Sequence, residues 1–202
     1  MRSNKIEVVL LAAGQSKRTG QENKLLLPFS EKTILETTVN HILQSNIGGL
    51  IVVIGHEHIK LRRILEKYDI RLVINKDYKN GQVSSIKKGL TEMREKSSFM
   101  IALADMPLIN KDHYNLLISS FAEMNLNRKT ILRPGSPEGR PGNPVLFDKI
   151  YRRELLDNKN RDSSKAILAQ NGDCLSYFET NIESFFLDID TLEDYGKFST
   201  SG

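Results

Sequence analysis

Short apolar runs alternate with amphipathic segments along most of this chain. The longest of these runs span residues 6–12, 50–55, 71–75 and 99–104. Uninterrupted apolar runs of this length are typical of strands that are buried on both faces of a parallel sheet. We also predict a strand at residues 130–134 and another near residues 175–178.

The segments between the first four strands repeat apolar residues at intervals of about three or four positions. Residues 32–45, 58–68 and 82–96 follow this pattern, which is typical of helices that pack on a sheet. A chain that alternates strands and helices in this way forms a largely parallel sheet with right-handed crossovers. We therefore predict an α/β fold.

The regular pattern ends at residues 133–147, where proline and glycine are frequent. We predict a long loop there, and long loops in compact domains are usually functional or disordered. Two helices, at 149–156 and 163–170, are predicted to follow it. Since the sequence shows neither a linker nor an internal repeat, we expect a single domain over residues 1–202.

Composition and charge narrow the class of protein. With 39% hydrophobic and 27% charged residues, the chain has the balance of a soluble globular protein. The formal net charge of +4 fits an anionic ligand, but the cations are spread along the chain and favour no nucleic acid partner. The single Cys174 excludes an internal disulfide, and no signal-peptide or membrane-span pattern is present. We expect a cytoplasmic protein that does not enter the membrane.

Gly14 and Gly20 lie in the turn that follows the first predicted strand. Open α/β sheets bind ligands at the carboxyl ends of their strands, so a phosphate cradle is expected in this turn. The spacing matches neither a Walker A loop nor G-x-G-x-x-G, which disfavours P-loop kinases and Rossmann dehydrogenases. Arg18 and Lys24 would neutralise a triphosphate and the charge that develops as it is cleaved. The alternative is a solvated surface loop.

Asp105 directly follows the strand predicted at 99–104. If this strand neighbours the first strand, the Asp105 carboxylate faces the glycine turn. A Mg²⁺ ion takes oxygen ligands and needs only one or two protein carboxylates besides phosphate oxygens. We therefore predict Asp105 as a metal ligand, with capping of the next turn as the alternative.

Asp188 and Asp190 are two positions apart at the end of an apolar run. In an extended strand both side chains would point to one face, where they would complete a metal site. Thr191 and Asp194 have the spacing of a capping box that opens a last helix. This segment therefore has a possible structural role beside its predicted role in the site.

The motif "LAAGQSKRTGQENKLLLP" at residues 11–28 resembles the L-A-A-G-x-S-x-R-x-G-x-x-K-L-L signature of the MobA-like nucleotidyltransferases. Within that family, the molybdenum cofactor cytidylyltransferases are the most similar. The resemblance extends over roughly residues 6–198 through "NGQVSSIKKGL", "LADMPL", "GNPVLF" and "LDIDTLEDY".

The resemblance implies transfer of CMP from CTP to the terminal phosphate of the molybdopterin-type molybdenum cofactor, with release of pyrophosphate. The product would serve the maturation of a molybdenum hydroxylase, and Mg²⁺ would bridge nucleotide and protein. The implied fold is a three-layer α/β/α sandwich with a mostly parallel Rossmann-like sheet, that of the nucleotide-diphospho-sugar transferases. Residues 1–107 or so would bind CTP and residues 108–198 or so the acceptor.

The matching motifs also imply residue roles. Nucleotide binding is implied for Leu11, Ala12, Ala13, Gly14, Ser16, Arg18, Gly20, Lys24, Gly81 and Ser84. Catalysis is implied for Arg18, Lys24 and Asp105, metal binding for Asp105, Asp188 and Asp190, and acceptor binding for Gly142, Asn143 and Pro144. For Ser84, at the start of a predicted helix, ordinary turn and cap chemistry is an equal alternative.

Three residues that differ from the family motifs and one that matches them bear on the identity of the substrate. Asn143 stands where the family usually has histidine, Ala104 where glycine is common before Asp-Met-Pro, and Thr19 where methionine is common. Ala13 favours CTP, since the guanylyl-transferring relatives carry Leu-Ala-Gly-Gly. Two alternatives stay open: a nucleotidyltransferase acting on a sugar or alditol phosphate, and a non-catalytic protein that carries or inserts molybdenum cofactor.

Overall fold

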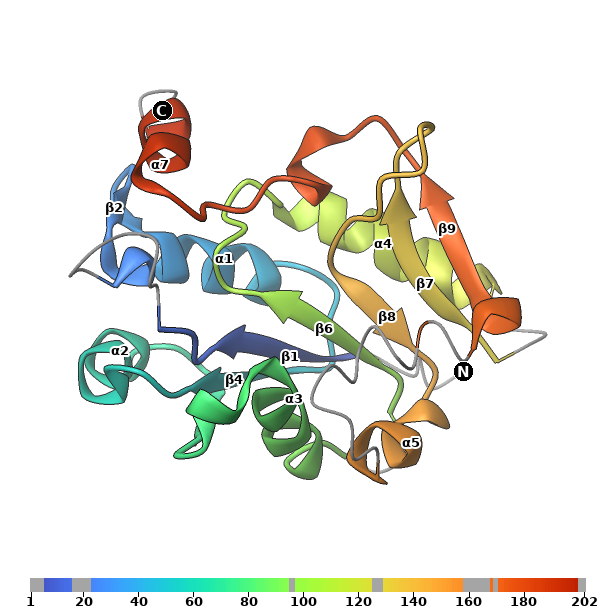
Figure 1. Cartoon of the computed structure of the whole chain (residues 1–202), viewed down its shortest axis with the longest axis horizontal. Coiled ribbons are helices and arrows are strands. Elements are labelled where there is room, and N and C mark those ends of the chain that lie inside the picture. The colour runs from blue at the N-terminus through green and yellow to red at the C-terminus, as the bar shows by residue number, and fades with distance from the viewer. Residues whose placement is uncertain are drawn as a thin grey trace.

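A seven-stranded sheet forms the middle layer of the protein (Figure 1). The computed structural model describes residues 6–15, 23–94, 97–124, 129–157, 168 and 171–199. The strands are β1 (Glu7–Ala12), β4 (Gly49–Ile54), β5 (Arg71–Ile74), β6 (Phe99–Leu103), β7 (Ile131–Gly135), β8 (Val145–Phe147) and β9 (Leu175–Glu179). Their order in the sheet is β5-β4-β1-β6-β8-β7-β9.

The sheet is mostly parallel, as the sequence predicts. Strand β1 pairs in parallel with β4 on one side and β6 on the other, and Leu11 lies opposite Val53 and Leu103. Strands β4 and β5, and likewise β7 and β9, are also parallel. Among the seven described strands of this sheet, only β8 runs against its neighbours, β6 and β7. The carboxyl ends of β1 and β6 therefore meet at one edge.

Helices cover both faces of the sheet, which makes the fold a three-layer α/β/α sandwich (Figure 1). On one face lie α1 (Ile34–Leu43), α2 (His58–Leu65) and α4 (Lys111–Met124), whose buried residues share a cluster with alternate strand positions. On the other face lie α3 (Gln82–Thr91) and α5 (Tyr151–Asp157). No described helix has both the length and the apolar character that a membrane crossing needs.

Burial on both faces explains the uninterrupted apolar runs of the sequence. All six residues of β1 are buried, and its apolar residues 8–12 alternate between the two core clusters, with Leu10 in one and Leu11 in the other. An antiparallel strand with one wet face would alternate apolar and polar residues instead. The apolar runs of β4 and β6 follow the same rule.

A short hairpin leads from the site region into α1. Strands β2 (Pro28–Phe29) and β3 (Lys32–Thr33) pair antiparallel, and α1 begins directly after Thr33. The Thr33 hydroxyl accepts a hydrogen bond from the Glu36 amide at 3.2 Å, and the Glu36 carboxylate accepts one from the Thr33 amide at 3.1 Å. This capping box fixes the first residue of α1.

The predicted loop at 133–147 is wrong in extent. Residues up to Gly135 continue β7, and Val145–Phe147 forms β8, so the connection covers 136–144. Pairing with β6, in which Val145 lies opposite Ile101, makes a strand of a run too short to be recognised in the sequence. Helix α4 was not predicted, and the helix predicted at 163–170 lies outside the described residues except Leu168.

Candidate active site

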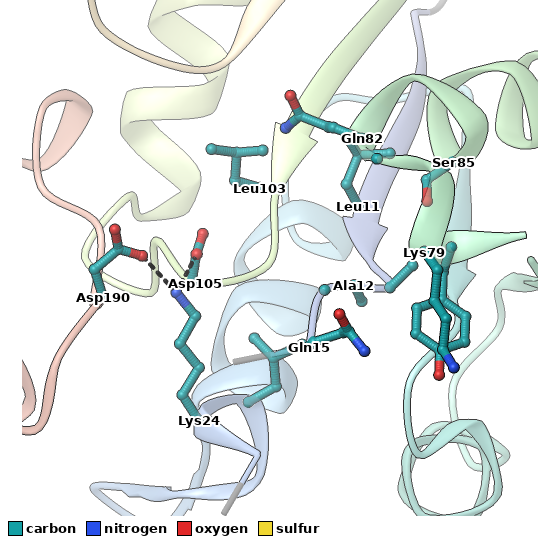
Figure 2. Close-up of a pocket in the computed structure, with 15 residues that line it drawn as sticks. Leu11, Ala12, Gln15, Lys24, Lys79, Gln82, Ser85, Leu103, Asp105 and Asp190 are labelled. Atoms are coloured by element: carbon teal, nitrogen blue, oxygen red, sulfur yellow. Dashed lines mark hydrogen bonds and ion pairs between the residues drawn. The ribbon is translucent and has the colours of Figure 1, made fainter. Parts of the chain in front are cut away.

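A cavity of about 500 Å³ opens at the carboxyl edge of β1 and β6. Its lining comes from distant parts of the chain, including the turn after β1, the start of α3 and the segment before α7 (Leu192–Ser199). Figure 2 shows Lys24, Asp105 and Asp190 on one side of it and Lys79 and Ser85 on the other. The cavity therefore lies at the carboxyl edge of the sheet, where the sequence predicts the site.

The turn after β1 supplies the floor of this cavity. Leu11, Ala12, Ala13 and Gly14, all predicted to bind nucleotide, line it. A β-carbon built on Gly14 would have no heavy atom of the described residues within 4 Å, so among these residues the glycine leaves open space beside the backbone. An anion can approach main-chain N–H groups most closely at such a position. The predicted Ser16, Arg18 and Gly20 lie outside the described residues.

Lys24 lies between two carboxylates. Its Nζ is 2.6 Å from Oδ2 of Asp105 and 2.7 Å from Oδ1 of Asp190, and its side chain is 12% exposed. Burial alone would lower the pKa of Lys24, but attraction and hydrogen bonds to Asp105 and then Asp190 outweigh it and raise the pKa above its ordinary value. The ammonium is therefore charged over the whole physiological range.

Local structure holds Lys24 in this position. The residue begins the short 3₁₀ helix η2 (Lys24–Leu26), whose first turn is capped by the Asn23 side chain accepting from the Leu25 amide at 3.2 Å. Leu25 is 4% exposed and packs in the core. A buried neighbour and a capped turn fix the direction in which the lysine leaves the backbone.

Asp105 carries a buried oxygen without a partner. Its Oδ2 accepts from Lys24, whereas Oδ1 is buried and has no hydrogen-bond partner among the described residues. The Asp105 carbonyl accepts from the Ile189 amide at 2.9 Å, which ties the segment before α7 to the end of β6. Because β6 neighbours β1, the predicted position of Asp105 beside the glycine turn is confirmed.

Three carboxylates gather at this point. Each of Asp105, Asp188 and Asp190 offers an oxygen, and these oxygens lie within 4.8 Å of one another. Burial, followed by repulsion from Asp190 and Asp105, raises the pKa of Asp188. The predicted extended strand at Asp188 and Asp190 does not form, but the buried Ile189 between them keeps both carboxylates at the cluster. The cluster and the unpartnered oxygen suit a hard divalent cation.

The next turn of the same segment is structural. The Thr191 amide and hydroxyl donate to Oδ2 of Asp194 at 2.9 and 2.7 Å, and the Thr191 hydroxyl accepts from the Asp194 amide at 3.1 Å. The predicted capping box is therefore present. Its first residue, Thr191, directly follows Asp190 and precedes α7, so capping by Asp194 and the position of Asp190 in the cluster are compatible.

The turn at Gly81, predicted to bind nucleotide together with Ser84, contributes other residues to the cavity than expected. Gly81 lines the cavity with a φ of 94°, a left-handed conformation that favours glycine. The Ser84 hydroxyl bonds to the carbonyls of Asp77 and Gly81 at 3.0 and 2.8 Å, which is the turn chemistry of the alternative interpretation. Ser85, the next residue, lines the cavity instead. 

Some lining residues were not predicted from the sequence. They include Gln15, Tyr78, Lys79 and Gln82. Their sequence signal is only their proximity to Gly14 and Gly81, the two predicted turns.

The predicted acceptor residues lie beside a second cavity of about 200 Å³. Asn143 lines it, and the backbone N–H of Asn143 donates to the Phe185 carbonyl at 2.9 Å. A β-carbon on Gly142 would come within 2.7 Å of the same carbonyl, so only glycine fits there without a shift. Pro144 is buried. Gln82 and Leu103 line both cavities, which makes them neighbours.

The mostly parallel sheet thus carries the glycine turn after β1 and an acid cluster beside the end of β6 at one edge. Residues 8–174 match the MobA-like NTP transferase domain. The chain therefore belongs to the MobA-like NTP transferase family, as the signature in its sequence predicts.

Three proteins similar to this chain in sequence are described by different functions. The purine catabolism protein PucB of Bacillus subtilis is 34% identical, with 96% of each chain covered. The molybdenum cofactor cytidylyltransferase of Escherichia coli is 29% identical, over 94% of this chain and 93% of the relative. The nicotine blue oxidoreductase of Paenarthrobacter nicotinovorans is 28% identical, over 92% of each.

Solved structures agree on the fold. A nucleotidyl transferase from a Methanothermobacter species has a TM-score of 0.81 at 21% identity, with 97% of this chain and 96% of the other covered. A Mycobacterium tuberculosis protein solved in complex with manganese has a TM-score of 0.78 at 20% identity, with 98% and 100% covered.

Proposed function

We propose that this protein transfers CMP from CTP to the terminal phosphate of a molybdopterin-type molybdenum cofactor and releases pyrophosphate. The observation that carries the proposal is the placement of Lys24, Asp105 and Asp190 in one cavity with the Gly14 turn, with Asp188 beside the two carboxylates. A cytidylyltransferase for this cofactor is among the relatives that match over nearly the whole chain.

Asp105, Asp190 and Asp188 would hold the divalent metal, which we propose to be Mg²⁺. Their carboxylate oxygens and the unpartnered Oδ1 of Asp105 are the hard ligands that this ion prefers. When bound, the ion would neutralise phosphate charge and bridge nucleotide and protein. A protein with the same fold has been solved in complex with manganese, which supports the choice of a divalent ion.

The chemistry is an in-line displacement at the α-phosphorus of CTP. A phosphate oxygen of the acceptor forms the new bond, the bond from the α-phosphorus to the bridging oxygen of the β-phosphate breaks, and pyrophosphate leaves. The attacking phosphate is already an anion, so no general base is required. The residues of the cavity contribute position and charge, with Lys24 placed to neutralise the leaving pyrophosphate.

The base preference and the division of labour are part of the proposal. Ala13 in the cavity floor supports CTP over GTP, because guanylyl-transferring relatives carry a second glycine there. Most residues of the first cavity precede position 107, whereas Arg133 and Asn143 of the second follow it. This supports a nucleotide part at about 1–107 and an acceptor part at about 108–198. The client would be a molybdenum hydroxylase.

A matrix of nucleotides and acceptors tests the function. Pyrophosphate release is measured for CTP, GTP and ATP with molybdenum cofactor, sugar phosphates or alditol phosphates, each with Mg²⁺. Release with CTP and molybdenum cofactor alone supports the proposal, whereas release with a sugar or alditol phosphate supports the other acceptor class. Cofactor binding without release from any nucleotide supports the carrier function.

A further inference from the structure

Arg133 is a half-buried cation in the wall of the second cavity. Its Nε and Nη2 donate to the Gly142 carbonyl at 3.2 and 2.8 Å. Within the described part of the chain it forms no ion pair with a carboxylate, although its guanidinium is partly removed from water. Buried charges are normally paired, so a guanidinium of this kind is suited to an anion that arrives as a ligand.

The strand register fixes the direction of this side chain. Ile131 packs in the core cluster under α3 and α5, and Leu132 packs in the cluster on the opposite face. Alternation along β7 therefore sends Arg133 to the α3 side, where it lines the cavity together with Gln82. Tyr177 lies opposite it on β9. 

The double hydrogen bond to one carbonyl holds the guanidinium plane in place. Such a group loses little conformational freedom when it binds a ligand, because packing and hydrogen bonds already fix its orientation. Burial lowers the pKa of Arg133 from its ordinary value, and Tyr177 opposes that change. The group still titrates far above neutrality, so it is a permanent cation.

The cavity around Arg133 suits a ligand with an apolar body and a charged end. Ile86, Ile101 and Phe147 give it an apolar lining, and Gln82 and Asn143 add polar residues to that lining. Because Gln82 and Leu103 are shared with the first cavity, a ligand bound here borders a nucleotide bound there. Two neighbouring subsites are what a transfer between two substrates needs.

We propose that the second cavity is the acceptor subsite and that Arg133 is the residue that binds the phosphate group of the acceptor. This inference rests on the proposed function and assigns the acceptor class to phosphate monoesters. A guanidinium recognises phosphate through two parallel N–H donors. Arg133 still has donors that no described residue accepts, because only Nε and Nη2 are used by Gly142.

Inorganic phosphate is the probe for this subsite. Its binding to the full-length protein is measured by isothermal titration, both alone and with the first cavity filled by α,β-methylene CTP and Mg²⁺. The variant is Arg133→Met, and the matched control is Arg153→Met, since Arg153 in α5 is 92% exposed and pairs with Asp157. Loss of a charge-assisted pair predicts phosphate binding about tenfold weaker or more in Arg133→Met and unchanged in Arg153→Met.

Arg133→Lys keeps a cation and serves if the methionine variant does not fold. A lysine lacks the planar fork, so phosphate binding is predicted to be several-fold weaker than in the wild type. Affinity for α,β-methylene CTP is expected to change less than about twofold in either variant. Wild-type phosphate affinity in Arg133→Lys, or no phosphate binding to the wild type, would overturn the assignment.

Failure here is distinguishable from failure of the proposed function. Phosphate binding that depends on Arg133, without pyrophosphate release from any nucleotide, counts against the transfer reaction only. Conversely, turnover by Arg133→Met with an unchanged KM for the acceptor counts against Arg133 only. A KM for the acceptor that rises about tenfold, with the KM for CTP unchanged, supports both.

Discussion

The ammonium of Lys24 lies 2.6 Å from Oδ2 of Asp105, and this ion pair joins η2 to the end of β6. The lysine also reaches Asp190, so it holds together two of the three carboxylates suited to a divalent ion. Its charge therefore offsets their mutual repulsion in this structure. A bound metal and triphosphate would compete with these contacts, since the carboxylates would bind the metal and the ammonium would face the phosphates.

Lys24→Met is predicted to have opposite effects on the metal and the nucleotide. Without the competing ammonium, the nucleotide-free protein should bind Mn²⁺ about tenfold more tightly, whereas CTP binding should weaken by about as much. Titration of Mn²⁺ by electron paramagnetic resonance measures the first effect. The control is Lys197→Met, which removes an exposed lysine paired with Glu193 in α7. Weaker Mn²⁺ binding in Lys24→Met would contradict the inference that the Lys24 ammonium competes with the metal for the carboxylates.

Asp105→Asn should reduce kcat by a factor of about 10² or more, because the amide cannot replace the charge of the carboxylate. The side chains have the same shape, so the fold should be retained. Mn²⁺ affinity is expected to fall in parallel with turnover. Asp157→Asn, at an exposed carboxylate of α5, is the matched control and should leave both unchanged. Full Mg²⁺-dependent activity in Asp105→Asn would show that the metal assignment is wrong.

Two glycines should separate folding from binding. Gly142→Ala places a β-carbon 2.7 Å from the Phe185 carbonyl, so the free energy of unfolding should fall by about 1–3 kcal/mol. Gly14→Ala meets no heavy atom within 4 Å in the part of the chain that the structure describes, and it should leave stability nearly unchanged. Its methyl group would occupy space beside the turn, so CTP binding should weaken. Chemical denaturation and CTP titration of both variants measure the two effects, and equal loss of stability would contradict the account.

Stability should fall as the pH drops below neutrality because of His113. Burial lowers its pKa below 6.5, repulsion from His41 adds to this, and Asp112 and the Leu108 backbone oppose it. The folded protein therefore favours the neutral imidazole, whose Nδ1 is 3.0 Å from the Ser184 hydroxyl. The unfolded chain takes up a proton first, so stability present above about pH 6.5 is lost as the pH falls through the lower folded pKa.

His113→Gln tests this pH dependence. Thermal unfolding is followed from about pH 7.5 to about pH 5, where the variant should lose less stability than the wild type. The same substitution at His58, in α2, controls for the loss of an imidazole. An identical pH dependence in the wild type and His113→Gln would rule out this histidine as the cause.

The strands under both helix layers could be predicted because burial on two faces leaves an uninterrupted apolar run. The edge that carries Asp105 followed from the same pattern, since parallel neighbours end together. Strand β8 could not be predicted in this way. Its three residues form a strand only because β6 and β7 supply hydrogen-bond partners on both sides.

The residues that meet in the site were harder to predict from the sequence than the edge of the sheet at which the site lies. The ion pair of Lys24 with Asp190 joins residues 166 positions apart, and periodicity carries no information on such distances. Ser84 and Ser85 are neighbours in the first turn of α3, and only the fold decides which hydroxyl closes the turn and which lines the cavity. Arg133 likewise became a candidate only when β7 placed it beside Gln82.

The central claim is tested most directly by following two labels of CTP in one reaction. The protein is incubated with Mg²⁺, molybdenum cofactor and CTP labelled at the α-phosphate or at the γ-phosphate, and the products are separated. The account predicts the α-label in the cofactor product and the γ-label in pyrophosphate, in equal amounts and with neither in Asp105→Asn. An α-label that stays in CTP while the cofactor is bound would contradict nucleotidyl transfer.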